Sequence, residues 1–278
     1  MYYPKGFDRN RAIMLAELVR QVYSQFEAFS NNKAWQLQGE STLVAELKLA
    51  TKPAPVKSFA ANFEKEHRQT KSKSHRDDGL PIGFIARRKS EAYLVFRGTM
   101  TTKEWIRDFN IHLKPYPYTQ AGKVHDGFIQ VYDVLRKSVH DAFGSIGYGK
   151  RLFVAGHSLG AALATLAALD LASTKRFKDL SVYTFGSPRV GNRLFATEFN
   201  RTLKQRSFRI ANTCDLVVSM PFPVPFLGFL GGYFTHVETP IDFTIQKEDG
   251  EKNHDLGTYL EALQINAGRN GLIRTLFK

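Results

Sequence analysis

Cysteine is almost absent from this chain of 278 residues, which contains Cys214 alone. A single cysteine excludes an intramolecular disulfide and fits a reducing compartment, although many secreted bacterial enzymes also lack disulfides. The sequence also shows no heptads, no collagen-like period and no internal repeat. These absences exclude a disulfide scaffold and a fibrous protein, and they leave a globular protein long enough to bury a large core.

Long hydrophobic runs are missing as well. No uninterrupted apolar run reaches the roughly 20 residues that a membrane-spanning helix needs, and the most apolar stretch, 216–232, is broken by three prolines. Residues 1–8 have no apolar segment after their basic residue, so we expect no cleavable signal peptide. By default this predicts a cytoplasmic protein, with export by a signal-independent route left open.

Acidic residues are outnumbered, because 39 lysines and arginines face 26 aspartates and glutamates, a formal net charge of +13. Such a charge attracts nucleic acid, anionic lipid or acidic substrates. The basic residues are spread along the chain apart from one cluster at 65–76, without zinc-ligand spacing or an RNP-like aromatic pattern. We expect no nucleic-acid partner, no metal and no cofactor. The charge serves solubility, and an anionic membrane surface is the alternative partner.

Strand and helix patterns alternate along most of the chain. Apolar residues recur at helical spacing over 9–28, with Asp8 as a suitable N-cap, whereas 53–80 reads as a long polar connection. The other predicted helices are 126–143, 159–173, 190–203 and 255–264, and the predicted strands are 81–86, 91–97, 151–155, 181–185, 207–211 and 238–246. This alternation predicts an α/β fold with a mostly parallel central sheet flanked by helices, in a single domain over 1–278.

One pentapeptide, Gly-His-Ser-Leu-Gly at 156–160, has the G-x-S-x-G pattern of the nucleophile elbow of serine hydrolases. An apolar run precedes it and an alanine-rich helical stretch follows it. In this arrangement a strained turn presents the serine hydroxyl, and the two glycines let strand and helix approach closely. The context predicts Ser158 as a nucleophile. The alternative is an ordinary strand-to-helix turn of an α/β protein.

A serine nucleophile needs a histidine base and an acid that orients it, and in this fold they follow in the order serine, acid, histidine. Asp215 comes directly after the predicted strand 207–211, at the carboxyl edge where such sheets bind ligands. We therefore predict Asp215 as the acid. The rival carboxylates lie in a strand pattern or in exposed segments, and they are Asp242, Asp249 and Asp255.

Two histidines follow the predicted acid, His236 and His254, and their placement in loops leaves both open as the base. His157 lies inside the elbow, where we expect packing and a structural hydrogen bond. The oxyanion of a tetrahedral intermediate needs N–H donors. We predict the backbone N–H of Leu159, directly after the nucleophile, and Thr99, which ends an earlier strand.

With these motifs in place, the chain resembles the class 3 lipases, a family that includes triacylglycerol lipases of filamentous fungi and related bacterial and plant acylhydrolases. The resemblance is continuous from about Phe96 to Leu171 and looser as far as Ala262. The elbow ends in GHSLGA where GHSLGG is commoner, and the disulfides of the fungal enzymes are absent. Besides the elbow, the motifs in order are FRGT at 96–99, WIRD at 105–108, HDGF at 125–128 and YTFGSPRVGN at 183–192.

The resemblance implies an α/β-hydrolase fold and distinguishes the two histidines. His254 is similar to the terminal histidine that opens the last helix of the family, and His236 is similar to a non-catalytic histidine earlier in the chain. By similarity Ser158 is the nucleophile, Asp215 the acid, His254 the base and Thr99 the oxyanion residue.

The family also carries a short lid helix, which corresponds to residues 101–108 here, with Trp105 and Ile106 as its apolar contacts. The alternative is a fixed helix, as in lidless feruloyl esterases of this fold. The apolar stretch after Asp215 is predicted to line an acyl groove or to touch lipid, through Phe222, Phe226 and Leu227. A buried loop packed into the core is the alternative.

These expectations together describe a serine carboxylic-ester hydrolase. The resemblance favours a triacylglycerol lipase acting on lipid or ester substrate at a lipid–water interface. Its nearest alternatives are a phospholipase A1 or galactolipid acylhydrolase, and then a short-chain or feruloyl-type esterase. A catalytically inactive lipid-binding protein that kept the fold is the alternative of another class.

Overall fold

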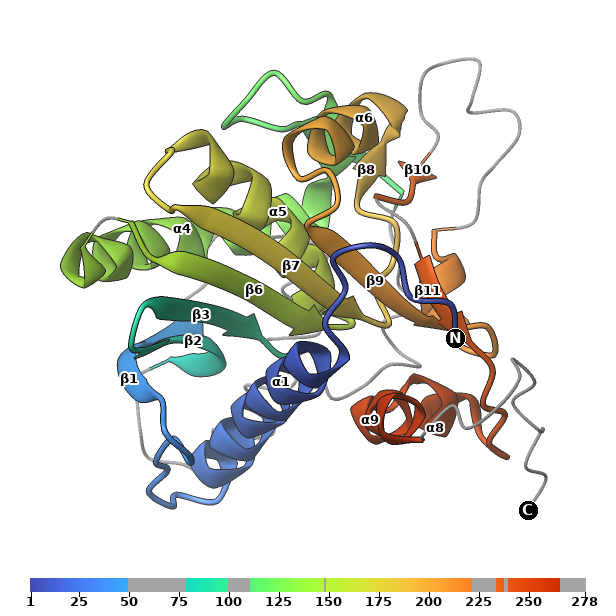
Figure 1. Cartoon of the computed structure of the whole chain (residues 1–278), viewed down its shortest axis with the longest axis horizontal. Coiled ribbons are helices and arrows are strands. Elements are labelled where there is room, and N and C mark those ends of the chain that lie inside the picture. Colours follow the sequence, from blue (N-terminus) through green and yellow to red (C-terminus); the bar gives the residue numbers. More distant parts are fainter. Residues whose placement is uncertain (50–78, 100–110, 148, 222–233, 238–239, 266–278) are drawn as a thin grey trace.

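A seven-stranded sheet, in the order β1-β2-β3-β6-β7-β9-β11, forms the centre of the molecule (Figure 1). The computed structural model describes residues 1–49, 79–99, 111–147, 149–221, 234–237 and 240–265. Neighbouring strands are parallel from β3 to β11, whereas β1 pairs with β2, and β2 with β3, in antiparallel orientation. The strands are β1 (Thr42–Leu49), β2 (Leu80–Arg88), β3 (Glu91–Phe96), β6 (Arg151–His157), β7 (Asp179–Phe185), β9 (Ser207–Asn212) and β11 (Pro240–Phe243). The predicted α/β fold with a mostly parallel sheet is confirmed.

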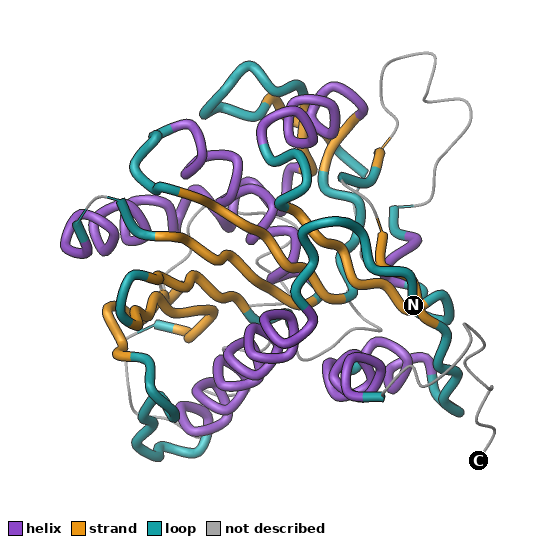
Figure 2. The backbone as a smooth tube through the Cα atoms, viewed as in Figure 1, coloured by secondary structure: helices purple, strands orange, loops and turns teal. Residues whose placement is uncertain are grey.

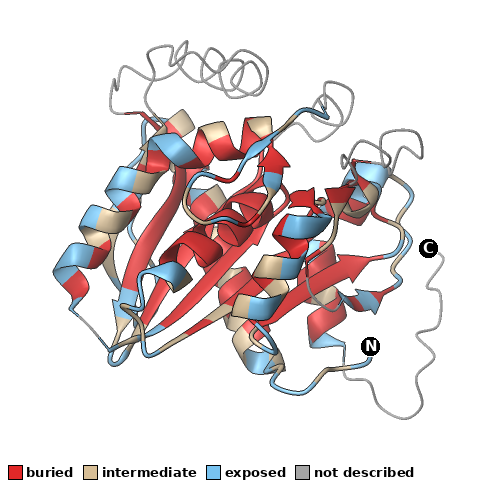
Figure 3. Ribbon diagram, turned by 90° about the horizontal axis from the view of Figure 1, so that it is seen from above, coloured by how far each residue is buried: buried red, intermediate tan, exposed pale blue. Residues whose placement is uncertain are grey.

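Helices cover both faces of this sheet (Figure 2). On one face, side chains of α1 and α9 pack with alternate strand residues such as Tyr93 and Val95; on the other, α4, α5 and α6 pack with Leu94 and Phe96. The helices are α1 (Arg9–Ser30), α4 (Asp126–Ile146), α5 (Leu159–Ser173), α6 (Arg193–Thr202), α8 (Gly250–His254) and α9 (Leu256–Gln264), with a 3-10 turn η1 (Val217–Ser219). Because both faces are covered, the central strands and α5 are buried over most of their length (Figure 3). Within the described ranges, no helix is long and apolar enough to span a membrane.

A small second sheet, in the order β10-β8-β5-β4, lies beside the main one. Its strands are β4 (Leu113–Pro115), β5 (Lys123–His125), β8 (Gly191–Asn192) and β10 (Phe234–Thr235). These strands and β1 were not predicted from the sequence. Strands of two or three residues are too short to show a periodicity, and β1 is largely half-exposed. Because Gly191 and Asn192 form β8, the helix predicted from residue 190 begins only at Arg193. The Asn192 side chain caps it by accepting a hydrogen bond from the N–H of Phe195 at 3.1 Å.

A charged network joins α4 to α5 through Asp170, whose side chain is 1% exposed. Its carboxylate accepts a hydrogen bond from the Tyr132 hydroxyl at 2.8 Å and two from Arg136 at 2.8 and 3.0 Å. It also lies 2.8 Å from Nε2 of His140. Burial by itself raises the pKa of Asp170, but the hydrogen bonds from these three side chains outweigh it and hold the pKa below its ordinary value.

The depressed pKa makes this network a source of acid-sensitive stability. Its contribution is present above the unfolded-state pKa of about 4 and is lost as the pH falls through the lower folded-state pKa. We expect Asp170→Asn to lower the free energy of unfolding by about 2 kcal/mol at pH 7, and the difference from wild type to shrink below about pH 4. Urea denaturation at both pH values measures this.

Asp179→Asn is the matched control, because it removes an exposed ion pair with Arg206 at 3.1 Å. Its expected cost is below about 1 kcal/mol. Equal losses in the two variants, or a loss in Asp170→Asn that does not change with pH, would contradict a stabilising role for the buried network.

Candidate active site

Ser158 lies at the turn between the end of β6 and the start of α5, with a φ of 59° and a ψ of −127°. A non-glycine residue at positive φ is strained, and strain of this kind concentrates at functional sites. The flanking glycines make the close turn possible. A Cβ on Gly156 would lie 2.1 Å from the carbonyl oxygen of Gly160, and a Cβ on Gly160 would lie 2.5 Å from the carbonyl oxygen of Arg97. Ser158 makes no side-chain capping bond to α5, so its hydroxyl is not committed to the helix.

His254 and Asp215 form a buried pair next to this turn. Nδ1 of His254 lies 2.6 Å from Oδ2 of Asp215, and each residue is 2% exposed. The other carboxylate oxygen accepts the N–H of Val217 at 2.8 Å, which fixes the carboxylate plane. Nε2 of His254 is buried and has no hydrogen-bond partner among the described residues. The pair therefore offers a histidine that is oriented on one side and has a free nitrogen on the other.

The other candidates from the sequence have different contacts. Nε2 of His236 lies 2.7 Å from the carbonyl oxygen of Val218. Burial, with the charges of Arg209 and Arg189, lowers the pKa of His236 to about 3, so this histidine is neutral at pH 7. Of the rival acids, Asp242 lies on β11, and Asp249 and Asp255 cap the starts of α8 and α9.

His254 is the last residue of α8, not part of the final helix, which begins at Leu256. The pattern at 255–264 was predicted as one helix, and its first residue is instead the N-cap. The side chain of Asp255 accepts a hydrogen bond from the N–H of Gly257 at 2.7 Å and starts α9 there. The junction between two short helices thus carries the histidine.

Tyr259 is a contact of the site that sequence reasoning missed. Its hydroxyl donates to Oδ2 of Asp215 at 2.6 Å and lies 3.3 Å from the N–H of Asn212. Burial, and then the charge of Asp215, raise the pKa of Tyr259 well above its ordinary value, so it remains a donor. In the sequence this tyrosine is one more residue on the buried face of a helix, and no signal reveals the partner of its hydroxyl.

Asn212 was also missed, although it joins the two segments that carry the acid and the histidine. Its Nδ2 donates to the carbonyl oxygens of Ile245 at 2.9 Å and Asn253 at 3.0 Å. Its Oδ1 accepts the N–H of Cys214 at 3.3 Å. The available sequence signal is an asparagine at the end of a strand, three residues before the predicted acid. It indicates a turn but does not identify these hydrogen-bond partners.

Gly98 and Thr99, here called the oxyanion loop after the role predicted for Thr99, follow β3. They lie against the turn at Ser158, here called the nucleophile turn after the role predicted for Ser158. A Cβ on Gly98 would be 2.6 Å from Cβ of Ser158, and Thr99 is buried. Leu159 is the first residue of α5, so its N–H has no partner inside the helix. Two groups with N–H donors thus lie beside Ser158, where the positive end of the α5 dipole favours negative charge.

Several predicted positions lie outside the described residues. These are most of the long connection at 53–80, the lid at 101–108 with Trp105 and Ile106, and the groove residues Phe222, Phe226 and Leu227. Within the described part of the chain, no group of histidine, cysteine and acidic side chains is placed to hold a metal ion.

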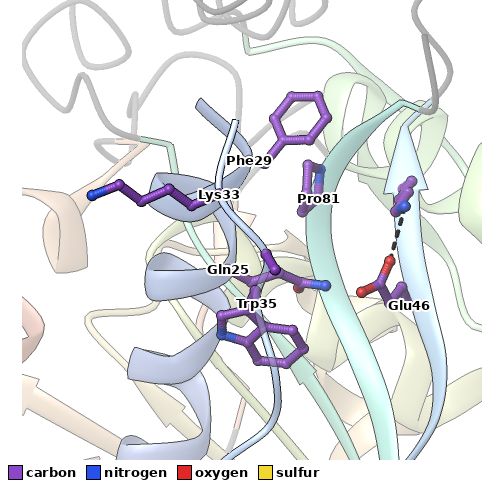
Figure 4. A pocket seen from close by; sticks show the side chains of 8 residues that line it. Gln25, Phe29, Lys33, Trp35, Glu46 and Pro81 are labelled. Atoms are coloured by element: carbon purple, nitrogen blue, oxygen red, sulfur yellow. Dashed lines mark ion pairs between the residues drawn. The ribbon is translucent and has the colours of Figure 1, made fainter. Parts of the chain in front are cut away.

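A pocket of about 220 Å³ lies between α1, β1 and β2, and it shares no residue with the site at Ser158 (Figure 4). Phe29, Trp35 and Pro81 form its apolar walls, and Glu46 lies at its edge in an ion pair with Lys48 at 2.8 Å.

The parallel sheet with a serine on a strained strand-to-helix turn is the architecture of the α/β hydrolases. Residues 93–224 match the family described as "Lipase (class 3)". This match confirms the resemblance to the class 3 lipases that the motifs implied.

Named relatives agree with this match, and a solved structure has a similar fold. A lipase of Rhizomucor miehei is 38% identical over 157 residues, 53% of this chain and 42% of the relative. A chloroplastic phospholipase A(1) of Arabidopsis thaliana is 32% identical over 164 residues, 52% of this chain and 36% of the relative. The chain thus spans less than half the length of these relatives. In structure, a Rhizomucor miehei lipase propeptide complex has a similar fold, with a TM-score of 0.59 and 22% identity, covering 85% of this chain and 67% of the other.

Proposed function

We propose that this protein hydrolyses carboxylic esters with Ser158 as nucleophile, His254 as base and Asp215 as the orienting acid. The observation that carries the proposal is the buried pair at 2.6 Å, which leaves Nε2 of His254 free beside the nucleophile turn. The order of the three residues in the chain is that of the α/β hydrolases.

In the first half of the reaction, Nε2 of His254 takes the proton of Ser158 as Oγ attacks the ester carbonyl carbon. Asp215 holds the proton on Nδ1 and stabilises the imidazolium that forms. The tetrahedral oxyanion is held by the Leu159 N–H and by Thr99, and collapse expels the alcohol, which receives the proton from His254. In the second half a water molecule attacks the acyl-enzyme and His254 takes its proton. The bond between the acyl carbon and Oγ then breaks, His254 returns the proton to Oγ of Ser158, and the carboxylic acid leaves.

The proposed substrate is an acylglycerol presented at a lipid–water interface. The name of the Rhizomucor miehei relative supports a lipase, and the apolar predicted groove at Phe222, Phe226 and Leu227 would take an acyl chain. The predicted lid, with Trp105 and Ile106, would cover that groove away from lipid and open where lipid buries its apolar side. A phospholipase A1 is the second candidate, favoured by the net charge of +13 and by the name of the Arabidopsis thaliana relative.

Hydrolysis of a substrate series tests the proposal, from short p-nitrophenyl esters to emulsified triacylglycerol and anionic phospholipid vesicles, with Ser158→Ala as the control. We expect activity that rises once the substrate forms an interface and that falls at least 10³-fold in Ser158→Ala. The preferred lipid then decides between the two candidates. Activity confined to soluble short esters would reject the lipase, and turnover that does not depend on Ser158 would reject the proposed triad.

A further inference from the structure

A chain of hydrogen bonds runs from the oxyanion loop to the histidine of the proposed triad, through two side chains that the reaction does not use. The backbone N–H of Gly98 donates to the hydroxyl of Tyr23 at 2.9 Å. That hydroxyl lies 2.7 Å from Nδ1 of His157, and Nε2 of His157 lies 2.7 Å from the carbonyl oxygen of His254. The chain thus joins α1, the loop after β3, the end of β6 and the end of α8.

The chemistry of the groups fixes the direction of every bond. Burial, and then the neighbouring His254, lower the pKa of His157 well below its ordinary value, so the ring is neutral and carries one N–H. A carbonyl oxygen only accepts, so that N–H is on Nε2 and points to His254. Nδ1 therefore accepts, and Tyr23 donates to it while accepting from Gly98.

We propose that Tyr23 is a positioning residue for the oxyanion loop, an inference that rests on the proposed ester hydrolysis. Gly98 lies against Ser158 and directly precedes Thr99. The tyrosine hydroxyl holds this loop at the nucleophile, and through His157 it holds the loop in register with the backbone of His254. One chain of hydrogen bonds thereby sets the distance between the oxyanion donors and the base.

Tyr23→Phe keeps the ring and removes only the hydroxyl. The Gly98 N–H and Nδ1 of His157 then lose this partner in a buried environment, which favours a loop that has moved to water or to another acceptor. Because the oxyanion is absent from the bound ester and forms only in the tetrahedral intermediate and the transition states beside it, the loss falls on kcat and not on substrate binding.

The test measures kcat and KM for p-nitrophenyl butyrate, with active enzyme titrated by a fluorophosphonate. We expect Tyr23→Phe to lower kcat about 10-fold or more, with KM within about twofold. The affinity for a trifluoromethyl ketone, which forms an oxyanion adduct with Ser158, is expected to fall by a similar factor.

Tyr132→Phe is the matched control, since it removes a buried tyrosine hydroxyl bond of 2.8 Å to Asp170 on another helix pair. We expect it to cost stability and to leave kcat unchanged. His157→Gln, whose amide keeps a donor and an acceptor, is expected to retain more activity than His157→Leu. The double variant with His157→Leu and Tyr23→Phe should have a kcat no lower than that of the worse single variant. If Tyr23→Phe does not fold, the comparison of His157→Gln with His157→Leu carries the test.

A rise in KM with kcat unchanged, or equal kinetic losses in Tyr23→Phe and Tyr132→Phe, would overturn the proposal. The tautomer offers a test that does not depend on turnover. In the wild type, ¹⁵N NMR is expected to show that Nδ1 of His157 is unprotonated. The Nδ1 resonance is expected to shift in Tyr23→Phe, because its hydrogen-bond donor is lost. A proton on Nδ1 in the wild type would overturn the proposal. If the wild type has no turnover that depends on Ser158, the proposed function fails, and the tautomer still decides whether the hydrogen-bond chain exists.

Discussion

Asp215→Asn is expected to lower kcat for ester hydrolysis by about 10⁴-fold with little change in KM. Oδ2 of Asp215 accepts from both Nδ1 of His254 and the hydroxyl of Tyr259, each at 2.6 Å. An asparagine that turns its NH₂ group to the histidine requires Nδ1 to accept. The proton of His254 then moves to Nε2, where it blocks removal of the proton from Ser158.

The measurement is steady-state turnover of a soluble ester over a range of pH, with the folded fraction monitored by circular dichroism. Asp242→Asn is the control, because Asp242 is the rival carboxylate on β11 and its side chain is not part of the site. We expect its kcat within about twofold of the wild type. Comparable losses in both variants, or a fall in Asp215→Asn that follows loss of folded protein, would reject Asp215 as the orienting acid.

Gly98→Ala is the second variant with a large expected effect, a fall in kcat of about 10²- to 10³-fold. The added Cβ would lie 2.6 Å from Cβ of Ser158, 2.9 Å from the hydroxyl of Tyr23 and 3.0 Å from the carbonyl oxygen of His157. Two of these neighbours belong to the rigid nucleophile turn, so the oxyanion loop has to retreat and takes Thr99 with it.

Gly144→Ala separates this effect from a general cost of adding a methyl group. Gly144 lies in α4, and a Cβ there meets nothing within 4 Å. By helix propensity this control is expected to gain up to about 1 kcal/mol of stability without a change in kcat. If Gly98→Ala also retained wild-type turnover, the close packing of Gly98 on Ser158 would have no functional consequence.

The sequence was informative where one physical requirement dominates the local pattern. Central strands buried on both faces read as continuous apolar runs, and a turn as tight as the one at Ser158 requires small residues at fixed spacing. Asp215 could be predicted because parallel strands bring their carboxyl ends to one edge of the sheet. Position alone left His236 and His254 open, since both follow the acid in loops; only the family resemblance favoured His254 before the fold placed it beside Asp215.

Contacts between distant segments could not be predicted. The hydroxyls of Tyr23 and Tyr259 belong to residues that continue the apolar face of a helix, and their partners come from other parts of the chain. The helix predicted at 255–264 begins one residue later because the side chain of Asp255 caps it, and the five-residue helix α8 before it was not predicted. Helix periodicity reports which face is buried, but not what a polar atom on that face meets.

The packing of α1 against α9 has a consequence for how the protein is made. The side chain of Arg9 binds the carbonyl oxygen of Leu263, 254 residues later in the chain, while α1 also supplies Tyr23 to the site. During synthesis α1 emerges long before α9. Its apolar face can pack on β2, β3 and β6 once those strands have left the ribosome, but its contacts with α9 form only when nearly all of the described chain has emerged. Contacts of such long range slow folding. Because His254 also comes late in the chain, the nascent chain acquires its arranged site only near the end of synthesis.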